Sequence, residues 1–273
     1  MLTAELLKLR TVAATKVTVA LGVVGLLVTQ VLLVTLLPAL ASGAIDTKGA
    51  AAELGTIDPG SVAFQYSALN PLGGMGGVGS VSIATIAVVV LGLLVATTDY
   101  RFGGIVTTAL AQPRRLRILG GKVAATAVVA AGLAVVYAVV VLGNLLVATL
   151  VIPGAELVLP AVDIVSTLVR GAAVVVLLAL LGVGIGVIVR SQLAGILVVI
   201  SLLVLEPIVQ ALAQALTGGV PLWAQLLPLS LGQAAIAQVG SLALHPLVAL
   251  AALAGIVLAV LVAAGAALRR RDL

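Results

Sequence analysis

The sequence has no cysteine, a single histidine and few charged residues. Without cysteine, the chain has no disulfides, thiolate metal sites or cysteine nucleophiles. The lone His245 excludes a histidine metal cluster and leaves little room for a histidine-dependent catalytic triad. Charged residues make up 8% of the chain, whereas an average soluble domain has about 25%. The chain therefore lacks the side chains on which many enzyme sites depend.

Apolar residues make up 63% of the chain, and its mean hydropathy is +1.37. Soluble domains are about 45–50% apolar, and a folded chain of this size still needs a polar surface toward water. The solvent around this protein is therefore expected to be apolar. The formal charge of +5 does not indicate nucleic-acid binding, because the basic residues lie between apolar spans and are not interleaved with aromatics.

Six apolar runs are close to or above the roughly 20 residues that a membrane-spanning helix needs. We place the predicted spans at residues 17–41, 80–98, 123–151, 166–189, 193–216 and 244–268. Runs such as AVVVLGLLVA do not alternate between apolar and polar residues, which argues against β-barrel strands. We predict an all-α polytopic membrane protein in which residues 1–273 form one transmembrane domain.

The basic residues predict how this domain is oriented. With the N-terminus in the cytoplasm, twelve of the 14 Lys and Arg residues fall in inner segments. These are Lys8, Arg10, Lys16, Arg101, Arg114, Arg115, Arg117, Lys122, Arg190, Arg269, Arg270 and Arg271. Lys48 and Arg170 fall on the outer side. Short loops rich in Lys and Arg stay cytoplasmic. We therefore expect the protein to lie in the inner (plasma) membrane with both termini in the cytoplasm and residues 42–79 on the outer side.

A cleaved signal peptide is an alternative for the first span, because residues 39–41 (Ala-Leu-Ala) resemble a signal-peptidase site. Signal peptides usually have an apolar core of about 7–15 residues. The first apolar run is longer than that, so we expect the span to be retained.

Two segments carry most of the charged residues on the predicted inner side. Residues 1–16 place Leu2, Leu6 and Leu9 on one helical stripe, which predicts a short helix in the inner membrane interface. A helical extension of the first span, with charges that only set the topology, is the alternative. Residues 99–122 form the largest inner loop, with five basic residues against one acid. Charge favours a topology anchor there, and a docking element for a cytoplasmic partner is the alternative.

The loop at residues 99–122 has further features. A short helix is predicted over residues 105–111, and Pro113 ends it. Neither the glycines at residues 73–77 nor Gly120-Gly121-Lys122 match a Walker loop, because the required Lys-Ser/Thr pair is missing. The chain therefore has no recognisable nucleotide-binding loop of its own.

Polar and apolar residues mix on the predicted outer side. Residues 217–243 are mostly apolar but are broken by Pro221 and Pro228, and Trp223 suits the headgroup level. This pattern predicts a pair of short re-entrant helices that dip into the outer leaflet before the last span.

Glu206, followed by Pro207, lies about 15 Å from the outer end of the fifth span at the rise of an α-helix. A charge at that depth costs from about 2.5 kcal/mol upward, and such residues usually face the bundle interior and pair. We predict a buried polar partner for Glu206, with Arg170 as the nearest candidate. A carboxylate on the substrate path, or one that acts as a conformational switch, is the alternative. Gly182 and Gly186 form a weak GxxxG match for close helix approach.

An acidic residue, then Tyr100-Arg101-Phe102-Gly103, a Thr-containing short helix, Pro113-Arg114 and Lys122 follow one another in residues 99–122. This segment resembles the loop between the second and third spans of the ABC-2 family of ATP-binding-cassette permeases. Glu5-Leu6-Leu7-Lys8-Leu9-Arg10-Thr11, the proline-broken outer segment and Glu206-Pro207 are also similar to that family. The resemblance covers the whole chain in layout and is most specific in the inner loop. Asp99 departs from it, because a glutamate is expected there.

The resemblance implies a six-span permease subunit of an ATP-driven exporter for an amphipathic or hydrophobic substrate such as a drug, antibiotic peptide or lipid. It implies a second permease copy or homologue and two ABC ATPase subunits, which would bind ATP and Mg²⁺ in place of any cofactor in this chain. The subunit itself would not be an enzyme. Residues 105–111 would form the coupling helix and residues 1–16 the connecting helix. The residues expected to couple the chain to the ATPase are Ile105, Val106, Leu110, Pro113 and Arg114.

A stand-alone secondary transporter is the main alternative function. That class usually has internal repeats and ionisable groups near the membrane midplane. Glu206 is the one clear candidate for such a group, and the two halves show no convincing repeat. An integral-membrane enzyme is disfavoured because the sequence has no clustered set of catalytic residues.

Overall fold

The computed structural model describes residues 2–42, 57–73, 81–101, 115–239 and 244–270, and every regular element in these ranges is a helix. Six helical units are long and apolar enough to cross a membrane. They are α2–η1–α3 (Ala13–Gln30, Val31–Leu36 and Leu37–Ala41), α5 (Ile83–Arg101), α7 (Arg115–Val151), α8 (Ala161–Val189), α9 (Gln192–Thr217) and α12 (Pro246–Arg270). The shorter helices are α1 (Leu2–Thr11), α4 (Val62–Ala68), α10 (Leu222–Gln225) and α11 (Pro228–Ile236). The protein is an all-α polytopic membrane protein, as its sequence predicts.

The predicted inner loop is where the helix boundaries differ most from expectation. Asp99 belongs to the end of α5, and Lys122 lies within α7. The loop is therefore shorter than residues 99–122, because its charged flanks continue the two helices. Residues 102–114, which include the predicted short helix, lie outside the described residues. In the fifth span, α9 continues through Pro207.

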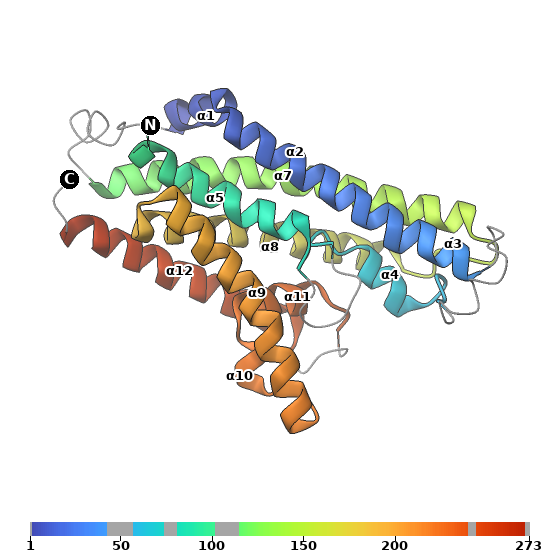
Figure 1. Cartoon of the computed structure of the whole chain (residues 1–273). Coiled ribbons are helices and arrows are strands. Elements are labelled where there is room, and N and C mark those ends of the chain that lie inside the picture. Colours follow the sequence, from blue (N-terminus) through green and yellow to red (C-terminus); the bar gives the residue numbers. More distant parts are fainter. Residues whose placement is uncertain (1, 43–56, 74–80, 102–114, 240–243, 271–273) are drawn as a thin grey trace.

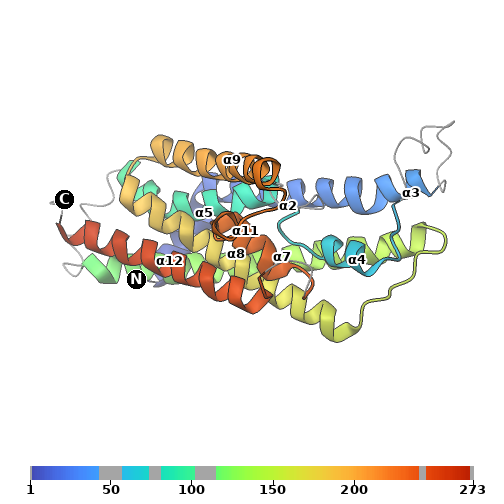
Figure 2. The same cartoon turned by 90° about the horizontal axis from the view of Figure 1, so that it is seen from below.

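The long helices form one bundle, and α8 lies at its centre in contact with α5, α7, α11 and α12 (Figure 1). The start of α1 and the end of α12 lie at the same end of the bundle, which we call the N/C end. Helices α3 and α4 lie at the other end, which we call the opposite end (Figure 2). This arrangement follows from an even number of spans, and it places the end of α5 and the start of α7 at the N/C end.

Glycines allow α5 and α8 to approach closely. A Cβ atom on Gly92 of α5 would overlap the carbonyl oxygen of Ala179, and one on Gly182 of α8 would overlap the carbonyl oxygen of Val89. One on Gly186 would lie 3.0 Å from the backbone oxygen of Leu93. Small residues of this kind let membrane helices pack backbone to backbone. The GxxxG match on the fourth span is therefore part of a real helix contact.

Helix α7 extends well beyond the width of a bilayer. Its 37 residues give a length of about 55 Å at 1.5 Å per residue, whereas the hydrocarbon core is about 30 Å thick. At the opposite end, Leu145 of α7 packs with Val34 and with Leu69 after α4 in a separate buried apolar cluster. This cluster holds the loops of the opposite end against the bundle.

A glutamine anchors the loop between α7 and α8 at the opposite end. Gln65 of α4 is fully buried. Its Nε2 donates to the carbonyl oxygen of Glu156 at 2.7 Å, and its Oε1 accepts the N–H groups of Val158 at 3.0 Å and Leu159 at 3.1 Å. A neutral amide thus satisfies three backbone groups of a connecting segment.

An asparagine supports an irregular turn in the first span. Residues Val31–Leu36 form a π-helical segment, a rare geometry that appears mostly as single turns inside α-helices. Asn144 of α7 donates its Nδ2 to the carbonyl oxygen of Gln30 at 2.9 Å and accepts the hydroxyl of Thr35 at 3.2 Å. The side-chain amide therefore bridges this segment and ties it to α7.

Candidate functional site

Helix α1 is a separate element that packs on the bundle. Val12 has an extended backbone (φ −70°, ψ 120°) between α1 and α2, so residues 2–11 are not a continuous extension of the first span. Leu9 is buried against Val95 of α5 and Ala125 of α7. The N-terminal segment is therefore a distinct short helix over Leu2–Thr11, and its placement in the inner membrane interface stays a prediction.

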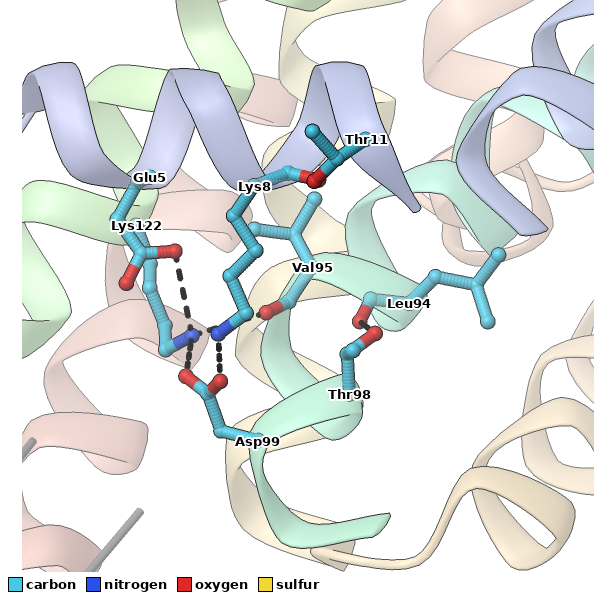
Figure 3. A network of polar contacts seen from close by, with 8 residues as sticks. All are labelled: Glu5, Lys8, Thr11, Leu94, Val95, Thr98, Asp99 and Lys122. Atoms are coloured by element: carbon cyan, nitrogen blue, oxygen red, sulfur yellow. Dashed lines mark hydrogen bonds and ion pairs between the residues drawn. The ribbon is translucent and has the colours of Figure 1, made fainter. Parts of the chain in front are cut away.

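A buried network of charges joins α1 to α5 and α7 at the N/C end (Figure 3). The Asp99 carboxylate of α5 forms ion pairs with Lys8 of α1 and Lys122 of α7. The Lys122 ammonium lies 3.6 Å from a carboxylate oxygen of Glu5 and donates a 3.0 Å hydrogen bond to the carbonyl oxygen of Val95. Three helices that are distant in sequence therefore meet at four charged side chains.

The burial of this network makes its charge balance important. The side chains of Asp99 and Lys122 are 2% and 3% exposed. Two acids face two lysines, so the cluster as a whole is neutral. Burial lowers the pKa of Lys8, the Lys122 charge acts in the same direction, and Glu5 opposes both. Removing one member of a buried ion pair typically costs about 3–5 kcal/mol, because the other charge is left without compensation.

The network borders the segment that the sequence singles out for partner docking. Asp99 and Lys122 stand on the two helices that lead into and out of residues 102–114. The predicted coupling residues Ile105, Val106, Leu110, Pro113 and Arg114 all lie outside the described residues, so their placement stays a prediction. Sequence reasoning noted both flanking charges but did not pair them. Their opposite signs at the two ends of one loop were the available signal.

A second buried polar site surrounds Glu206 of α9, which is 3% exposed. Its carboxylate accepts the backbone N–H groups of Leu229 at 3.0 Å and Ser230 at 2.6 Å. Gln210 lies one turn further along α9, donates to Glu206 at 3.4 Å and also donates to the Ser230 hydroxyl. The prediction that Glu206 faces the interior and has polar partners is therefore confirmed.

Leu229 and Ser230 lie in the first turn of α11, where backbone N–H groups have no partner within the helix. Pro228 begins this helix and has no N–H to satisfy. The Glu206 carboxylate thus serves as an N-terminal cap supplied by another helix, and its negative charge matches the positive end of the α11 dipole.

Arg170 is not the partner of Glu206. Its Nη1 donates to the carbonyl oxygens of Ala235 at 3.0 Å and Ala237 at 3.1 Å, which are at the C-terminal end of α11. A cation near the last carbonyls of a helix stabilises that end. Glu206 and Arg170 therefore hold the two ends of one short helix. Arg170 was the wrong candidate because α11 lies between the two side chains. The sequence predicts short helices in this segment but not their position in the bundle.

Comparisons of the chain with protein-family models, with curated proteins and with solved structures each found no match. Within the described parts of the chain, no three His, Cys, Asp or Glu residues are grouped so that they could hold a metal ion. The membrane spans and the two buried polar sites are therefore the features from which a function can be inferred.

Proposed function

We propose that this protein is the membrane-spanning permease subunit of an ATP-driven exporter for an amphipathic or hydrophobic substrate. The observation that supports this proposal most is the charged network of Glu5, Lys8, Asp99 and Lys122, which fixes both flanks of residues 102–114 to α1. A segment that is moved by a partner must be held rigidly at both ends, because flexible ends would not pass the movement on to the membrane spans.

In this mechanism the ATPase contacts residues 102–114, and the network makes the ends of α1, α5 and α7 respond together. Helix α5 then carries the movement into the bundle through its close glycine contact with α8. The chain has no nucleotide-binding loop, so ATP and Mg²⁺ belong to the ATPase subunits. A second permease copy or a homologue completes the translocation path.

The charge distribution supports a cytoplasmic N/C end. Lys8, Arg10, Lys16, Arg117, Lys122, Arg190 and Arg269 all belong to segments at or near that end. Among the Lys and Arg residues whose side chains the structure describes, only Arg170 of α8 lies away from the N/C end. Short segments rich in Lys and Arg stay in the cytoplasm, so we place both termini and the ATPase contact there, in the plasma membrane.

Co-expression with an ATPase encoded by a neighbouring reading frame tests the proposal. The two proteins should copurify, and the complex should hydrolyse ATP faster when its substrate is present. Replacing Ile105 and Leu110 together with Asp should detach or uncouple the ATPase while the permease still inserts. Replacing Arg114 with Ala is the matched control, because an exposed ion pair contributes about 0–1 kcal/mol.

Two results would count against the proposal in different ways. Normal substrate-stimulated ATPase activity in the double Asp variant would remove the coupling role of residues 102–114. Failure to bind any ABC ATPase, together with ATP-independent transport in proteoliposomes, would favour a secondary transporter. The buried Glu206 carboxylate is the feature that such a transporter would use, although here two backbone N–H groups of α11 already occupy it.

A further inference from the structure

A cavity of about 480 Å³ lies beside the turn between α8 and α9, at the N/C end of the bundle. It is lined by Tyr100, Arg190, Ser191, Gln192, Leu193 and Ile196. The lining therefore combines a cation and an aromatic ring with the first turn of α9 and two apolar side chains.

The Arg190 guanidinium has hydrogen-bond donors that no described residue uses. It lies 5.7 Å from the centre of the Tyr100 ring, a distance at which a cation and an aromatic face attract each other. Its Nε and Nη2 atoms are buried and have no hydrogen-bond partner among the described residues. Leaving a buried charged donor unsatisfied is unfavourable. An acceptor supplied by a ligand would remove that penalty.

The backbone at Arg190 adds a second, independent observation. Arg190 has φ 61°, and it is the non-glycine residue with positive φ in the part of the chain that the structure describes. This left-handed conformation costs a side chain about 1–2 kcal/mol. The residue ends α8 by donating its N–H to the Gly186 carbonyl oxygen at 2.9 Å. A glycine would make the same turn without strain, so what arginine adds at this position is its guanidinium.

The surroundings indicate the chemistry of the ligand. Arginine presents a planar pair of donors that matches a phosphate group, and the N-terminal end of the 26-residue helix α9 also favours an anion. Next to these groups, Leu193 and Leu197 of α9 are 72% and 58% exposed. An apolar chain can therefore lie along α9 while its anionic head occupies the cavity.

We propose that this cavity binds the phosphate headgroup of an anionic phospholipid, with an acyl chain along the exposed apolar face of α9. The turn between two membrane spans lies at the depth of lipid headgroups, which makes a membrane lipid the natural source of the phosphate. This site is independent of the proposed transport function. It holds equally for a permease or for any other six-span protein with this fold.

Native mass spectrometry of the full chain in detergent tests the site with phosphatidylglycerol and phosphatidylcholine of equal chain length. The wild-type protein should bind phosphatidylglycerol more tightly. Arg190→Gln should weaken that binding about tenfold or more, the effect of losing one charge-assisted hydrogen bond. Arg190→Lys should fall between the two, because it keeps the charge but loses the planar fork. Arg269→Gln removes an exposed charge at the same end and should bind like the wild type.

A further variant and a competition experiment separate loss of the site from loss of folding, and lipid binding from phosphate binding. Arg190→Gly removes the guanidinium while relieving the positive φ, so it should fold and still lose the preference for phosphatidylglycerol. Inorganic phosphate and glycerol phosphate should compete only weakly, because they lack the acyl chain. Equal losses in the Arg190 and Arg269 variants, or no preference between the two lipids, would overturn the site. Binding of inorganic phosphate as tight as that of the lipid would overturn the assignment to a lipid.

Discussion

At the N/C end, Asp99 and Lys122 join three helices through full charges, whereas at the opposite end Gln65 and Asn144 join helices and loops through neutral amides. Both sets of contacts are buried or partly buried, and both bring together segments that are distant in sequence. They differ in what an outside group can do to them. A positive charge brought close to Asp99 would compete with Lys8 and Lys122 for its carboxylate. The neutral amides of Gln65 and Asn144 carry no net charge that could attract such a group.

This contrast indicates that the two ends of the bundle have different roles. A buried ion-pair network is sensitive to the loss or arrival of a single charge. Hydrogen bonds between neutral groups contribute about 0.5–1.5 kcal/mol each, and they mainly specify geometry. Under the proposed function, the opposite end would serve as a fixed frame and the N/C end would be the part that responds to the ATPase. The predictions below test this difference, beginning with the largest expected effect.

The largest loss of stability is expected for Asp99→Asn. The substitution leaves Lys8 and Lys122 facing each other, and Lys122 is almost fully buried. We expect a loss of about 3–5 kcal/mol, the usual result of breaking a buried pair from one side. Thermal or denaturant unfolding of the purified protein in detergent measures it. Asp163→Asn in the first turn of α8 is the control and should lose about 1 kcal/mol or less.

A double-mutant cycle shows whether the loss arises from the pairing. Adding Lys122→Met to Asp99→Asn removes the uncompensated cation. The double variant should therefore lose less free energy of unfolding than the two single variants lose together. Residues in direct contact show such non-additivity of about 0.5–3 kcal/mol. Strictly additive losses would mean that the two side chains act separately, and the network would then not be a unit.

At the opposite end, Gln65→Met should cost about 2–3 kcal/mol. The thioether cannot replace the bonds to the carbonyl oxygen of Glu156 and the N–H groups of Val158 and Leu159, each worth about 1 kcal/mol. Gln225→Met, which loses a single 2.8 Å bond to the carbonyl oxygen of Val220, is the matched control. If the Gln65 variant lost as much as Asp99→Asn, the energetic contrast between the two ends would be wrong.

The number of spans and their approximate positions were predictable from the length of the apolar runs. Their limits were less so, because α7 begins eight residues before the predicted span and includes charged residues. The pair of short helices before α12 was also predictable, since Pro221 and Pro228 break that segment into pieces. The polar contacts were not. Asp99 and Lys122 are 23 residues apart, and their pairing depends on how α5 and α7 pack. Hydropathy indicates that Glu206 needs a partner, but it cannot show that the partner is the first turn of α11.

Glu206 combines both kinds of contact, since it is a charge whose partners are neutral. Glu206→Gln keeps an oxygen that accepts from the first turn of α11, so it should lose about 1 kcal/mol, mainly from the helix-dipole term. Glu206→Leu removes both acceptors and leaves the N–H groups of Leu229 and Ser230 buried without them, which should cost about 2–4 kcal/mol. Unfolding curves of the two variants decide this. Equal losses would show that charge, and not hydrogen bonding, holds α11.

The smallest effect is expected for Lys8→Met, although Lys8 belongs to the same network as Asp99. Its side chain is 33% exposed, and Asp99 keeps its ion pair with Lys122 when Lys8 is lost. Partial exposure screens the pair, so we expect a loss of about 1 kcal/mol. We expect function to respond more than stability, because Lys8 supplies the ion pair between α1 and α5. In the proposed complex with an ATPase, Lys8→Met should therefore reduce substrate-stimulated hydrolysis while the unfolding temperature changes by only a few degrees. Thr11→Val, on the same helix and outside the ion pairs, serves as the control. Unchanged hydrolysis in the Lys8 variant would show that α1 takes no part in the response of the N/C end.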